Sequence, residues 1–360
     1  VGSSERTDCS NVAVRVALTE PAAHLYAQGG YDACVEDADG AFSCWGAHGY
    51  RIGTAPTPDR LRPEPAPTFD GAQSFANAFI MTCWLDADGA PWCIGDNGVG
   101  ELGQGDFALY VTPVRPRLED PTAPALEGLV EIATSTTFGG TACARTSEQL
   151  YCWGQNDLGQ IGDPAPHTIC VSGIDEFDCT PWVTPIAFER TADIARLSLG
   201  SQHTCALLTD ATVWCWGQNR NGELALGSPG MQDVAARRAP VEVTNLTDIA
   251  QIELGARHSC ARRNDGTVWC WGSNDFGQLG DGVLDHPEPS CMNGSSLVDC
   301  TSVPVQVAGI DDAVDLDVGR HHSCVIRSDA TVWCWGINDY YEVAPGTRDS
   351  VFTPTQVTSL

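Results

Sequence analysis

The amino-acid sequence predicts an all-β fold, a β-propeller built from four-stranded antiparallel blades. Three observations carry this prediction: a cysteine-rich segment recurs six times, each copy has the pattern of a β-hairpin, and the composition is rich in glycine and proline. The 360 residues include 37 Gly, 22 Pro and 11 Trp, and 42% are hydrophobic. Such a composition suits a large β-rich core and excludes a mainly helical protein.

The repeat is clearest in HTCALLTDATVWCWGQNRNGEL, HSCARRNDGTVWCWGSNDFGQLG and HSCVIRSDATVWCWGINDYYEV, at residues 203–224, 258–280 and 322–343. Looser copies lie at residues 32–53, 81–103 and 141–162. The glycine after the tryptophan position recurs at intervals of 49 to 64 residues, at Gly46, Gly95, Gly154, Gly217, Gly272 and Gly336. A period of this length indicates a repeat architecture.

Each copy predicts a hairpin with one further strand on either side. Two apolar runs flank a turn such as Asp265-Gly266, whose residues tolerate the positive φ that tight turns need. Upstream strands are expected at 194–199, 249–254 and 314–318, and downstream strands at 183–186, 303–307 and 353–357. Four antiparallel strands then form one small sheet per repeat.

These sheets need cover on both faces. Alternation along a strand places Trp214 and Trp216 on one face and Val213 and Cys215 on the other, so both faces are apolar. Radial stacking of copies around an axis supplies that cover, which favours a β-propeller with six visible blades.

The 17 cysteines are spaced as pairs. Six pairs flank the hairpin turns: Cys34 with Cys44, Cys83 with Cys93, Cys143 with Cys152, Cys205 with Cys215, Cys260 with Cys270, and Cys324 with Cys334. Two more, Cys170 with Cys179 and Cys291 with Cys300, lie in loop-like sequence, and Cys9 is left over. None forms the CxxC pattern typical of zinc sites, so we expect disulfides and an exported protein.

The hairpin disulfides are expected to be local staples. Opposed residues on antiparallel strands are close enough for a disulfide. A bridge that closes about ten residues contributes roughly 2.5–3 kcal/mol in the chain-entropy model. Each bridge therefore stabilises its own hairpin and does not tie distant parts of the chain together.

The charge is strongly acidic, with 47 Asp and Glu against 19 cationic residues, all of them arginine, and a net charge of −28. The lack of lysine excludes Schiff-base and P-loop chemistry, and the acid excess argues against nucleic acid and anionic membranes as partners. No transmembrane run or signal peptide is present, which fits a mature exported chain without membrane insertion. The exclusive use of arginine points to a GC-rich bacterial source.

The recurring G-x-x-H-[ST]-C, V-W-C-W-G and N-x-x-G-[QE]-L-G motifs resemble the repeat of the RCC1 (regulator of chromosome condensation) family over roughly residues 24–358. The resemblance implies a propeller, often with seven blades. Repeats 1 to 3 depart from it, because Asp32, Met81 and Thr141 replace the histidine, and Ile94 replaces a tryptophan in repeat 2. Residues 1–23 are expected to form an extension with one extra strand at 12–18, and residues 24–360 a single propeller domain.

Three histidines occupy one repeat position, His203, His258 and His322. Rotational symmetry could bring them together near the axis as a metal site, with His321 beside them. The simpler interpretation is that each buried imidazole hydrogen-bonds the backbone at the strand entry. We therefore expect no metal and no cofactor, and keep the histidine site as the alternative.

Two sets of acidic and amide residues each have a structural and a functional interpretation. The pairs Asp37 with Asp39 and Asp86 with Asp88 lack the twelve-residue loop and distal Glu of an EF-hand, so turn chemistry explains them. Gln251, Glu253, Asp315 and Asp317 fall on one side of expected inner strands. They predict an acidic channel lining, with a hydrolytic acid pair as the alternative.

The candidate binding loops are the two that carry extra cysteine pairs. Each has eight residues between its cysteines and follows the G-[QE]-[LI]-G motif, and a bridge that stiffens a loop lowers the entropy lost on binding. The alternative is surface decoration that protects the loops from proteases. The candidate residues are Cys170, Ile174, Asp175, Glu176, Phe177, Cys179, Cys291, Met292, Asn293 and Cys300. The proline-rich stretch 55–68 is predicted to be a polyproline-like connector.

No GxSxG, HExxH or GxGxxG motif in a strand-to-helix setting is present, so the sequence predicts no enzyme. We expect a secreted, periplasmic or cell-surface scaffold that binds a protein or a surface glycan. A subunit of a larger or self-associated assembly is one version, in which Cys9 and residues 12–18 join neighbours. The alternatives are a secreted enzyme inhibitor, similar to bacterial propellers of this superfamily, or an enzyme with a metal or acidic site at the axis.

Overall fold

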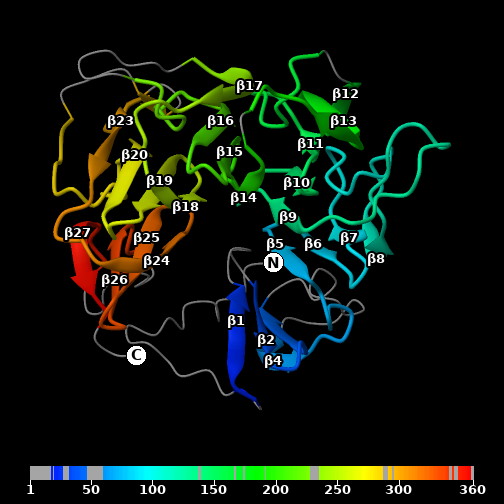
Figure 1. Ribbon diagram of the computed structural model, residues 1–360, viewed down its shortest axis with the longest axis horizontal. Helices are drawn as coiled ribbons and strands as arrows, with labels where there is room; N and C mark the ends of the chain where they lie inside the picture. The colour runs from blue at the N-terminus through cyan, green and yellow to red at the C-terminus, as the bar shows by residue number, and fades with distance from the viewer. Residues whose placement is uncertain are drawn as a thin grey trace. The chain divides into compact units, whose positions relative to one another are not determined.

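The computed structural model describes residues 18, 20–26, 32–46, 60–136, 139–165, 168–172, 175–190, 192–227, 235–286, 291–293, 296–339, 343 and 348–357. Within these ranges every regular element is a β-strand and there is no helix, so the all-β prediction is confirmed (Figure 1). Cys9 and residues 12–17 of the predicted extra strand lie outside the described residues.

The described strands form six antiparallel sheets of four or five strands, which we call blades 1 to 6 in chain order, and one separate two-stranded sheet. Blade 1 consists of β1 (Ala22–Tyr26), β2 (Asp32–Asp37), β3 (Phe42–Gly46) and β4 (Arg60–Pro65). Blade 2 consists of β5 (Ser74–Asn77), β6 (Met81–Leu85), β7 (Pro91–Gly95) and β8 (Tyr110–Val114). Blade 3 consists of β9 (Glu131–Thr134), β10 (Thr141–Arg145), β11 (Leu150–Gln155), β12 (Thr168–Ser172) and β13 (Asp175–Ile186).

Blade 4 consists of β14 (Ile194–Leu199), β15 (His203–Leu208), β16 (Val213–Gly217) and β17 (Arg237–Glu242). Blade 5 consists of β18 (Ile249–Leu254), β19 (His258–Arg263), β20 (Val268–Ser273) and β23 (Cys300–Gln306), with a separate small hairpin of β21 (Met292–Asn293) and β22 (Ser296–Leu297). Blade 6 consists of β24 (Ala313–Val318), β25 (His322–Arg327), β26 (Val332–Gly336) and β27 (Val351–Gln356). The strands of blades 1 to 4 belong to one compact unit and those of blades 5 and 6 to another.

Every blade is built around the predicted hairpin, and a disulfide closes each one. In blade 4, Cys205 lies directly opposite Cys215, and their Cα atoms are 4.1 Å apart. This separation is the close approach of a non-hydrogen-bonded antiparallel pair. The other five hairpin bridges share the 4.1 Å separation: Cys34 with Cys44, Cys83 with Cys93, Cys143 with Cys152, Cys260 with Cys270, and Cys324 with Cys334.

The two loop bridges form as well. The Cα atoms of Cys170 and Cys179 are 5.9 Å apart, and those of Cys291 and Cys300 are 6.1 Å apart. Both separations lie within the range that a disulfide spans. All eight predicted disulfides are therefore confirmed.

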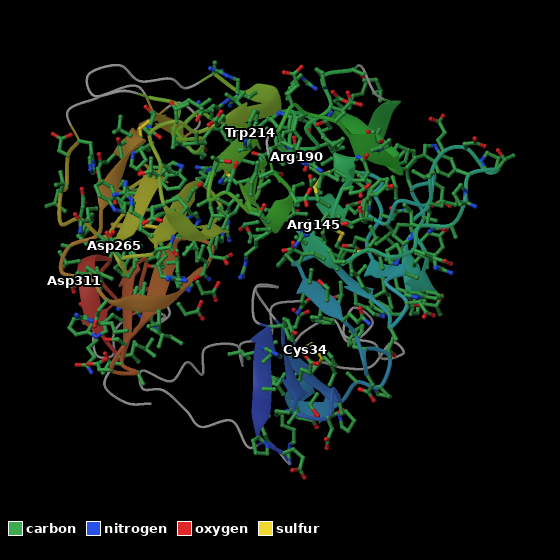
Figure 2. All side chains as sticks on the ribbon, in the orientation of Figure 1. Cys34, Arg145, Arg190, Trp214, Asp265 and Asp311 are labelled. Carbon is green, nitrogen blue, oxygen red and sulfur yellow. A yellow bond between two sulfur atoms is a disulfide. The ribbon has the colours of Figure 1, made fainter. Side chains whose placement is uncertain are left out.

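Aspartates shape the hairpin turns, as their sequence position indicates. The Asp37 carboxylate accepts hydrogen bonds from the backbone N–H groups of Asp39 and Ala41, each at 2.9 Å. Asp265, labelled in Figure 2, accepts bonds from the N–H and hydroxyl of Thr267 in the same way. Gly40 then takes the left-handed conformation, with φ of 78°. The acidic pairs of the DADG segments are therefore turn residues.

Part of the proline-rich stretch of repeat 1 is a strand, which corrects the prediction of a connector for residues 60–65, whereas residues 66–68 lie outside any strand. Residues 60–65 form β4 and pair with β3, with Cys44 opposite Glu64. Prolines are compatible with this position because β4 is the edge strand of its sheet, where a missing N–H breaks no ladder bond on the outer side. Residues 55–59 lie outside the described part of the chain.

Adjacent blades are joined by a hydrogen bond from a buried indole. The Nε1–H of Trp216 in blade 4 donates to the carbonyl oxygen of Gln160 in blade 3 at 2.9 Å. The same bond runs from Trp271 to Glu223 at 2.7 Å, and three of the four tryptophans involved belong to the V-W-C-W-G motif. All four rings are fully buried, and the complete set is Trp153 to Glu101, Trp216 to Gln160, Trp271 to Glu223 and Trp335 to Gln278.

Two further features strengthen this junction. The hydroxyl of Ser259 also donates to the Glu223 carbonyl, at 3.0 Å, so one oxygen accepts from two groups of the next blade. Trp335 donates to the carbonyl of Gln278, and Gly280 lies two residues further along the chain. The glycine leaves space for the indole, because a Cβ at this position would lie 2.6 Å from Nε1. The N-x-x-G-[QE]-L-G motif is therefore the socket into which the next blade's tryptophan fits.

Each socket loop is closed by an asparagine side chain. The Oδ1 atom of Asn219 accepts a hydrogen bond at 2.9 Å from the backbone N–H of Leu224, five residues further on. Asn274 does the same for Leu279 at 3.1 Å. Both asparagines are buried, so their amides replace water in satisfying backbone groups that the loop would otherwise leave unpaired.

Two sockets carry a buried glutamate where the others carry glutamine. Glu101 and Glu223 accept hydrogen bonds from backbone N–H groups two residues earlier, as Gln160 and Gln278 do. Burial raises the pKa of Glu101 to about 7, although the N–H of Val99 favours its charged form. Burial also raises the pKa of Glu223 above its ordinary value. We therefore expect the two corresponding sockets to be sensitive to pH.

We expect Glu101→Gln to gain stability relative to wild type as the pH rises from about 5 to 8. A carboxyl group whose pKa is raised on folding destabilises the folded state increasingly as the pH rises through its unfolded and folded pKa values, here 4.5 and about 7. The full effect is on the order of 2–3 kcal/mol. Thermal unfolding of both proteins across this range measures the difference.

The reciprocal Gln160→Glu variant should show the opposite pH trend, and Glu189→Gln, at an exposed position, should show none. A difference between wild type and Glu101→Gln that stays constant across this pH range would contradict a titrating Glu101.

Candidate binding groove on blade 3

The cysteine pair of repeat 3 staples an extra hairpin onto blade 3. β13 is twelve residues long: its first part pairs with β12 and its second part with β11 (Figure 1). Cys170 on β12 and Cys179 on β13 are both fully buried, and Glu176 near the tip is exposed. Ile174, and the side chains of Asp175 and Phe177, lie outside the described part.

A groove of about 750 Å³ opens beside the base of this hairpin. One wall is the loop after β8, with Leu118, Glu119, Asp120 and Ala123. The lining also includes β13 from Cys179 to Pro185, together with Asp163 and Ala165. This volume lies within the range of small-ligand pockets in proteins. Among the predicted candidate residues, Cys179 lies in its lining.

Backbone contacts hold the two walls together. The N–H of Gly105 donates to the Pro181 carbonyl at 2.7 Å, and the N–H of Val183 donates to the Arg117 carbonyl at 3.0 Å. Leu118 and Val183 also form a parallel β-bridge. The loop of blade 2 is thus joined to the edge of β13 by main-chain hydrogen bonds, and the groove is part of the folded framework.

Trp182 supplies the aromatic surface of the groove. Its side chain is partly buried, and the guanidinium of Arg117 lies 5.2 Å from the ring centroid. That guanidinium also donates to the Gln104 carbonyl, at 2.9 Å from Nη2. Gly105 packs so closely against the indole that a Cβ there would collide with it. Trp182 is therefore held in place while part of its ring stays accessible.

The charge of the groove is negative. Glu119, Asp120 and Asp163 line it, and none of its lining residues is an arginine or a histidine. Hydrogen bonds from the hydroxyl and N–H of Thr122 lower the pKa of Asp120, so its carboxylate stays charged. Three carboxylates thus line the groove, and the guanidinium of Arg117 lies 5.2 Å from the ring centroid of Trp182 in the same lining.

A threonine in the lining has an unused hydroxyl. Thr180 is 6% exposed, and its Oγ1 atom has no hydrogen-bond partner among the described residues. The matching Thr301 of blade 5 accepts a bond at 3.0 Å from the N–H of Val303 and donates one to its carbonyl. Pro181 follows Thr180 where Ser302 follows Thr301. Blade 3 thus leaves free a polar atom that blade 5 satisfies internally.

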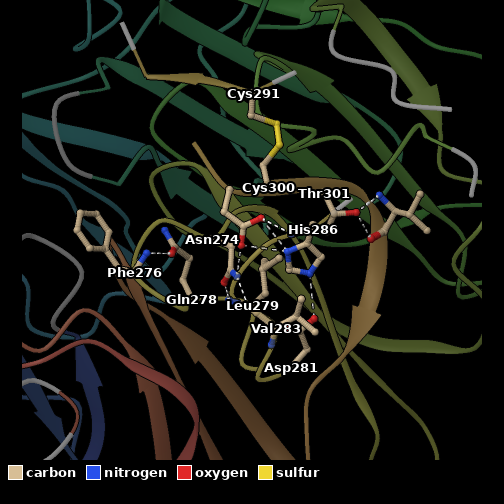
Figure 3. Close-up of polar contacts among 12 residues, drawn as sticks. Asn274, Phe276, Gln278, Leu279, Asp281, Val283, His286, Cys291, Cys300 and Thr301 are labelled. Atoms are coloured by element: carbon tan, nitrogen blue, oxygen red, sulfur yellow. Dashed lines mark hydrogen bonds and ion pairs between the residues drawn. A yellow bond between two sulfur atoms is a disulfide. The ribbon is translucent and has the colours of Figure 1, made fainter. Parts of the chain in front are cut away.

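The second disulfide-bridged loop lies in blade 5. It is held by His286 between Asp281 and Asp299, an arrangement that we call the histidine clamp. The His286 ring lies between two carboxylates: Nε2 is 3.0 Å from Oδ2 of Asp281, and Nδ1 is 2.9 Å from Oδ1 of Asp299 (Figure 3). Asp299 precedes Cys300 and also accepts a bond from Asn274 at 2.7 Å. In blade 3 the matching Asp178 pairs with Arg238 at 2.7 Å.

The clamp stays charged at neutral pH. Burial alone would lower the pKa of His286, but the hydrogen bonds and charges of Asp281 and Asp299 outweigh it and raise the pKa to about 9. The same bonds lower the pKa of Asp299 despite its partial burial. The loop bridged by Cys291 and Cys300 is therefore fixed by an ion pair as well as by its disulfide. The side chains of Met292 and Asn293 within it lie outside the described part.

We expect His286→Asn to destabilise the protein most below about pH 6.5 and progressively less as the pH rises through about 9. The folded-state pKa lies above the ordinary value of 6.5, so the stabilisation is complete below 6.5 and is lost through 9. Its size should be on the order of 2 kcal/mol. Thermal unfolding of the variant and wild type between about pH 6 and 10 measures it.

His24→Asn, at an exposed position on β1, is the control and should show no such trend. An unfolding difference for His286→Asn that does not shrink between about pH 7 and 10 would show that the imidazolium contributes nothing.

The three motif histidines form contacts within the fold. Complete burial lowers the pKa of His203 to about 3, which keeps its ring neutral. Nε2 of His258 is hydrogen-bonded to the hydroxyl of Ser323 in the next blade at 3.0 Å. The ring of His322 packs against Gly319, where a Cβ would collide with it. In the described ranges no group of three or more His, Cys, Asp or Glu is arranged to hold a metal.

The residues of the predicted acidic lining differ in burial. Gln251 and Glu253 on β18 are buried, and Nε2 of Gln251 donates to Oδ1 of Asp315 on β24 at 3.0 Å. Asp315 and Asp317 are exposed. Gln251 thus bridges blades 5 and 6 through a side-chain hydrogen bond.

Reasoning from sequence alone missed Trp182, Glu119 and Asp120. One signal was present: every other tryptophan lies in a repeat hairpin, and Trp182 lies just after Cys179 and outside that pattern. Glu119 and Asp120 carry no such signal, because they come from a different repeat. Contact across blades brings them to the groove.

Repeats of a known family match the second half of the chain. The models of the regulator of chromosome condensation (RCC1) repeat match residues 147–207, 210–262 and 265–326, and 194–223, 249–278 and 313–342. Together these cover just over half of the chain. The fold is thus a β-propeller of RCC1-type repeats, as predicted, with six blades in the described residues. Blade 3 has a fifth strand, β12, and each of the other five blades has four strands.

The chain belongs to the RCC1 repeat family. It is 27% identical over 299 residues to protein pim1 of Schizosaccharomyces pombe and 27% identical over 320 residues to the ultraviolet-B receptor UVR8 of Arabidopsis thaliana. These alignments cover 81% and 85% of this chain but 52% and 63% of the relatives. The chain therefore spans about half to two thirds of the length of these relatives.

Solved structures agree on the fold. Human WBSCR16 superposes with a TM-score of 0.73 at 16% identity, covering 97% of this chain and 84% of that one. Yeast RCC1 (Prp20), solved bound to Kap60, gives a TM-score of 0.73 at 19% identity, covering 93% and 74%. No helix of the described part has the length and apolar character needed to cross a bilayer.

Proposed function

We propose that the chain is an exported, disulfide-stapled scaffold that binds a partner protein in the groove of blade 3. The observation that carries this proposal is the groove itself: a volume of about 750 Å³ bounded by a cystine-stapled hairpin and a hydrogen-bonded loop. A preformed site loses little conformational entropy on binding, so moderate contact area supports useful affinity.

The family supports a protein as the partner. Structures of the yeast relative Prp20 were determined in complex with Kap60 and in a study of its binding to Gsp1p and histones. Those partners belong to Prp20, but they place protein binding among the uses of this fold. Glycan binding has no comparable support, since Trp182 is the single aromatic residue in the groove lining.

Export is supported by the cysteines. Sixteen of the 17 cysteines form disulfides. Disulfides persist in an oxidising compartment and are reduced in the cytosol. A secreted inhibitor and a subunit of a surface assembly are both protein-binding roles for such a chain, and the identity of the partner separates them.

We expect the native protein to be recovered from the cell envelope or medium with all eight bridges closed. Intact cells are treated with a membrane-impermeant thiol reagent, and the unreduced chain is mapped by mass spectrometry. A cytosolic protein of the same cells, with known free thiols, serves as control. Recovery of the chain in the cytosolic fraction with free thiols at these positions would overturn the export proposal.

We expect Ala123→Arg to abolish partner capture. Ala123 lines the groove, and an arginine there fills the space and cancels part of its negative charge. Ala125→Arg is the matched control, because Ala125 is exposed on the same loop but does not line the groove. Each purified protein is used to capture partners from its native envelope and medium, with quantitative mass spectrometry of the bound proteins.

The proposal requires at least one captured protein that is lost with Ala123→Arg and kept with Ala125→Arg. Circular dichroism and thermal unfolding confirm that both variants fold. Equal capture by both variants would place any binding surface elsewhere on the chain.

A further inference from the structure

Two loops of blades 5 and 6 gather positive charge in a chain that is strongly acidic. Each loop joins the first strand of its blade to the second: residues 255–257 run between β18 and β19, and residues 319–321 between β24 and β25. The N–H of Ala256 donates to the Arg320 carbonyl at 3.0 Å, so the two loops are in direct contact. We call Arg257, Arg320 and His321, together with the neighbouring Phe276, the arginine patch.

The repeat fold does not require cations in these loops. The residue just before the second strand is uncharged in blades 2, 3 and 4, where it is Ile80, Gly140 and Gln202. In blades 5 and 6 the same position holds Arg257 and His321. The cations are therefore additions to the repeat and not part of its framework.

The guanidinium of Arg257 has no partner in the described part of the chain. It forms neither a hydrogen bond nor an ion pair there, although the side chain is half-buried. The loop itself is held by the main chain, because the Arg257 carbonyl accepts a hydrogen bond from the N–H of Ser273 at 2.9 Å. A guanidinium carries five N–H donors. Those of Arg257 are thus available to a ligand, and the fold does not depend on them.

The acids that face Arg257 compensate its charge incompletely. Burial raises the pKa of Glu223 and of Asp275, although the charge of Arg257 acts in the opposite direction on both. The Glu223 carboxyl accepts hydrogen bonds from the N–H and the side-chain amide of Asn221, at 2.8 and 3.0 Å. Asp275 accepts one from the hydroxyl of Ser273 at 3.3 Å. Both carboxyl groups therefore have other hydrogen-bond donors, and neither forms an ion pair with this guanidinium among the described residues.

The local potential is positive in spite of the net charge of −28. Burial is the largest cause that lowers the pKa of His321 to about 4, and the charges of Arg320 and Arg257 lower it further. The neutral ring packs against Phe276, with the ring centroids 5.4 Å apart. Arg320 is exposed and Phe276 is half-buried. The patch thus combines two guanidinium groups with an accessible aromatic surface.

A carboxylate is the group that this patch fits best. The planar N–H donors of a guanidinium match the two oxygens of a carboxylate. Acids elsewhere on the chain repel anions, but salt screens this repulsion beyond about 8 Å at physiological ionic strength. A short acidic segment can therefore reach the patch, whereas a long polyanion such as nucleic acid would meet the surrounding acids. An apolar side chain beside the acid can pack against Phe276.

We propose that the arginine patch binds an acidic segment of a partner protein, whose Asp or Glu side chains pair with Arg257 and Arg320. This inference goes beyond the proposed function, because the patch lies in the compact unit of blades 5 and 6 and the groove of blade 3 in the other unit. A second copy of this chain is also acidic, but a net charge of −28 on each copy opposes association. The occupant is therefore a segment of a different protein.

The test uses a positional-scanning library of fluorescein-labelled octapeptides with acetylated N-termini and amidated C-termini, so that only side chains carry charge. Each sublibrary fixes one residue type at one position, and its retention on the immobilised full chain is measured at about 150 mM NaCl. We expect sublibraries with fixed Asp or Glu to be retained better than those with fixed Asn or Gln. The comparison with the amides isolates the charge from the shape of the side chain.

Two double variants carry the same change in net charge. Arg257→Gln with Arg320→Gln neutralises the patch, and Arg62→Gln with Arg348→Gln neutralises two exposed arginines outside it. We expect about a tenfold or greater loss of affinity for the best acidic peptide in the first variant and less than about twofold in the second. Arg257→Lys keeps the charge but loses the paired donors, so its loss should be intermediate. Thermal unfolding confirms that each variant folds.

Equal losses in the two double variants, or equal retention of acidic and amide sublibraries by the wild type, would overturn the inference. Tighter binding of a labelled DNA oligonucleotide than of the best acidic peptide would overturn it too. So would self-association in size-exclusion chromatography that the patch variant abolishes, because the occupant would then be a second copy. In each of these cases the proposed function is judged separately, by the loss of the captured partner in Ala123→Arg.

Discussion

The structure depends on a single repeated contact, the hydrogen bond from a buried tryptophan of one blade to a main-chain carbonyl of the preceding blade. A four-stranded sheet with tryptophan, cysteine and valine on its two faces is not stable alone, because both faces need apolar cover. The indole supplies that cover and also satisfies the carbonyl that it buries, as in the bond from Trp216 to Gln160. Glycine at positions such as Gly162 and Gly280 follows from this contact, since any side chain there would displace the ring.

The hairpin disulfides stabilise single hairpins, whereas the tryptophan contact links neighbouring blades. Each hairpin bridge joins directly opposed residues about ten positions apart, so it limits the unfolded chain without linking one blade to another. Contacts between blades depend on the buried tryptophans and on side-chain bridges. Arg145, labelled in Figure 2, is one of these bridges: it pairs with Glu131 in its own blade and donates to the Ala195 carbonyl in blade 4 at 2.6 Å.

This division of labour leaves the segment between the third and fourth strands free to vary, and the candidate site arises there. Blades 3 and 5 both insert a cystine-bridged loop at this place, but they fix it with different charges: Arg238 against Asp178 in one, His286 between two aspartates in the other. Of these two blades, blade 3 has the loop of blade 2 packed along its edge, which makes the groove. Binding sites of this kind lie on variable loops that the repeated strands hold in place. Changes in these loops allow one repeat fold to bind different partners.

The sequence by itself determined the six hairpins, the eight disulfides, the four-stranded blades and the family, because each of these rests on short-range spacing that repeats along the chain. It also indicated the stapled loop that holds Cys179. Tertiary structure alone decided that residues 60–65 form an edge strand in spite of their prolines, that His286 is clamped by Asp281 and Asp299, and that Glu119 and Asp120 meet Trp182. The physical reason is the same in each case: these features depend on which edge or neighbouring blade a residue meets, and the residues that meet there come from repeats whose loops differ in length and composition.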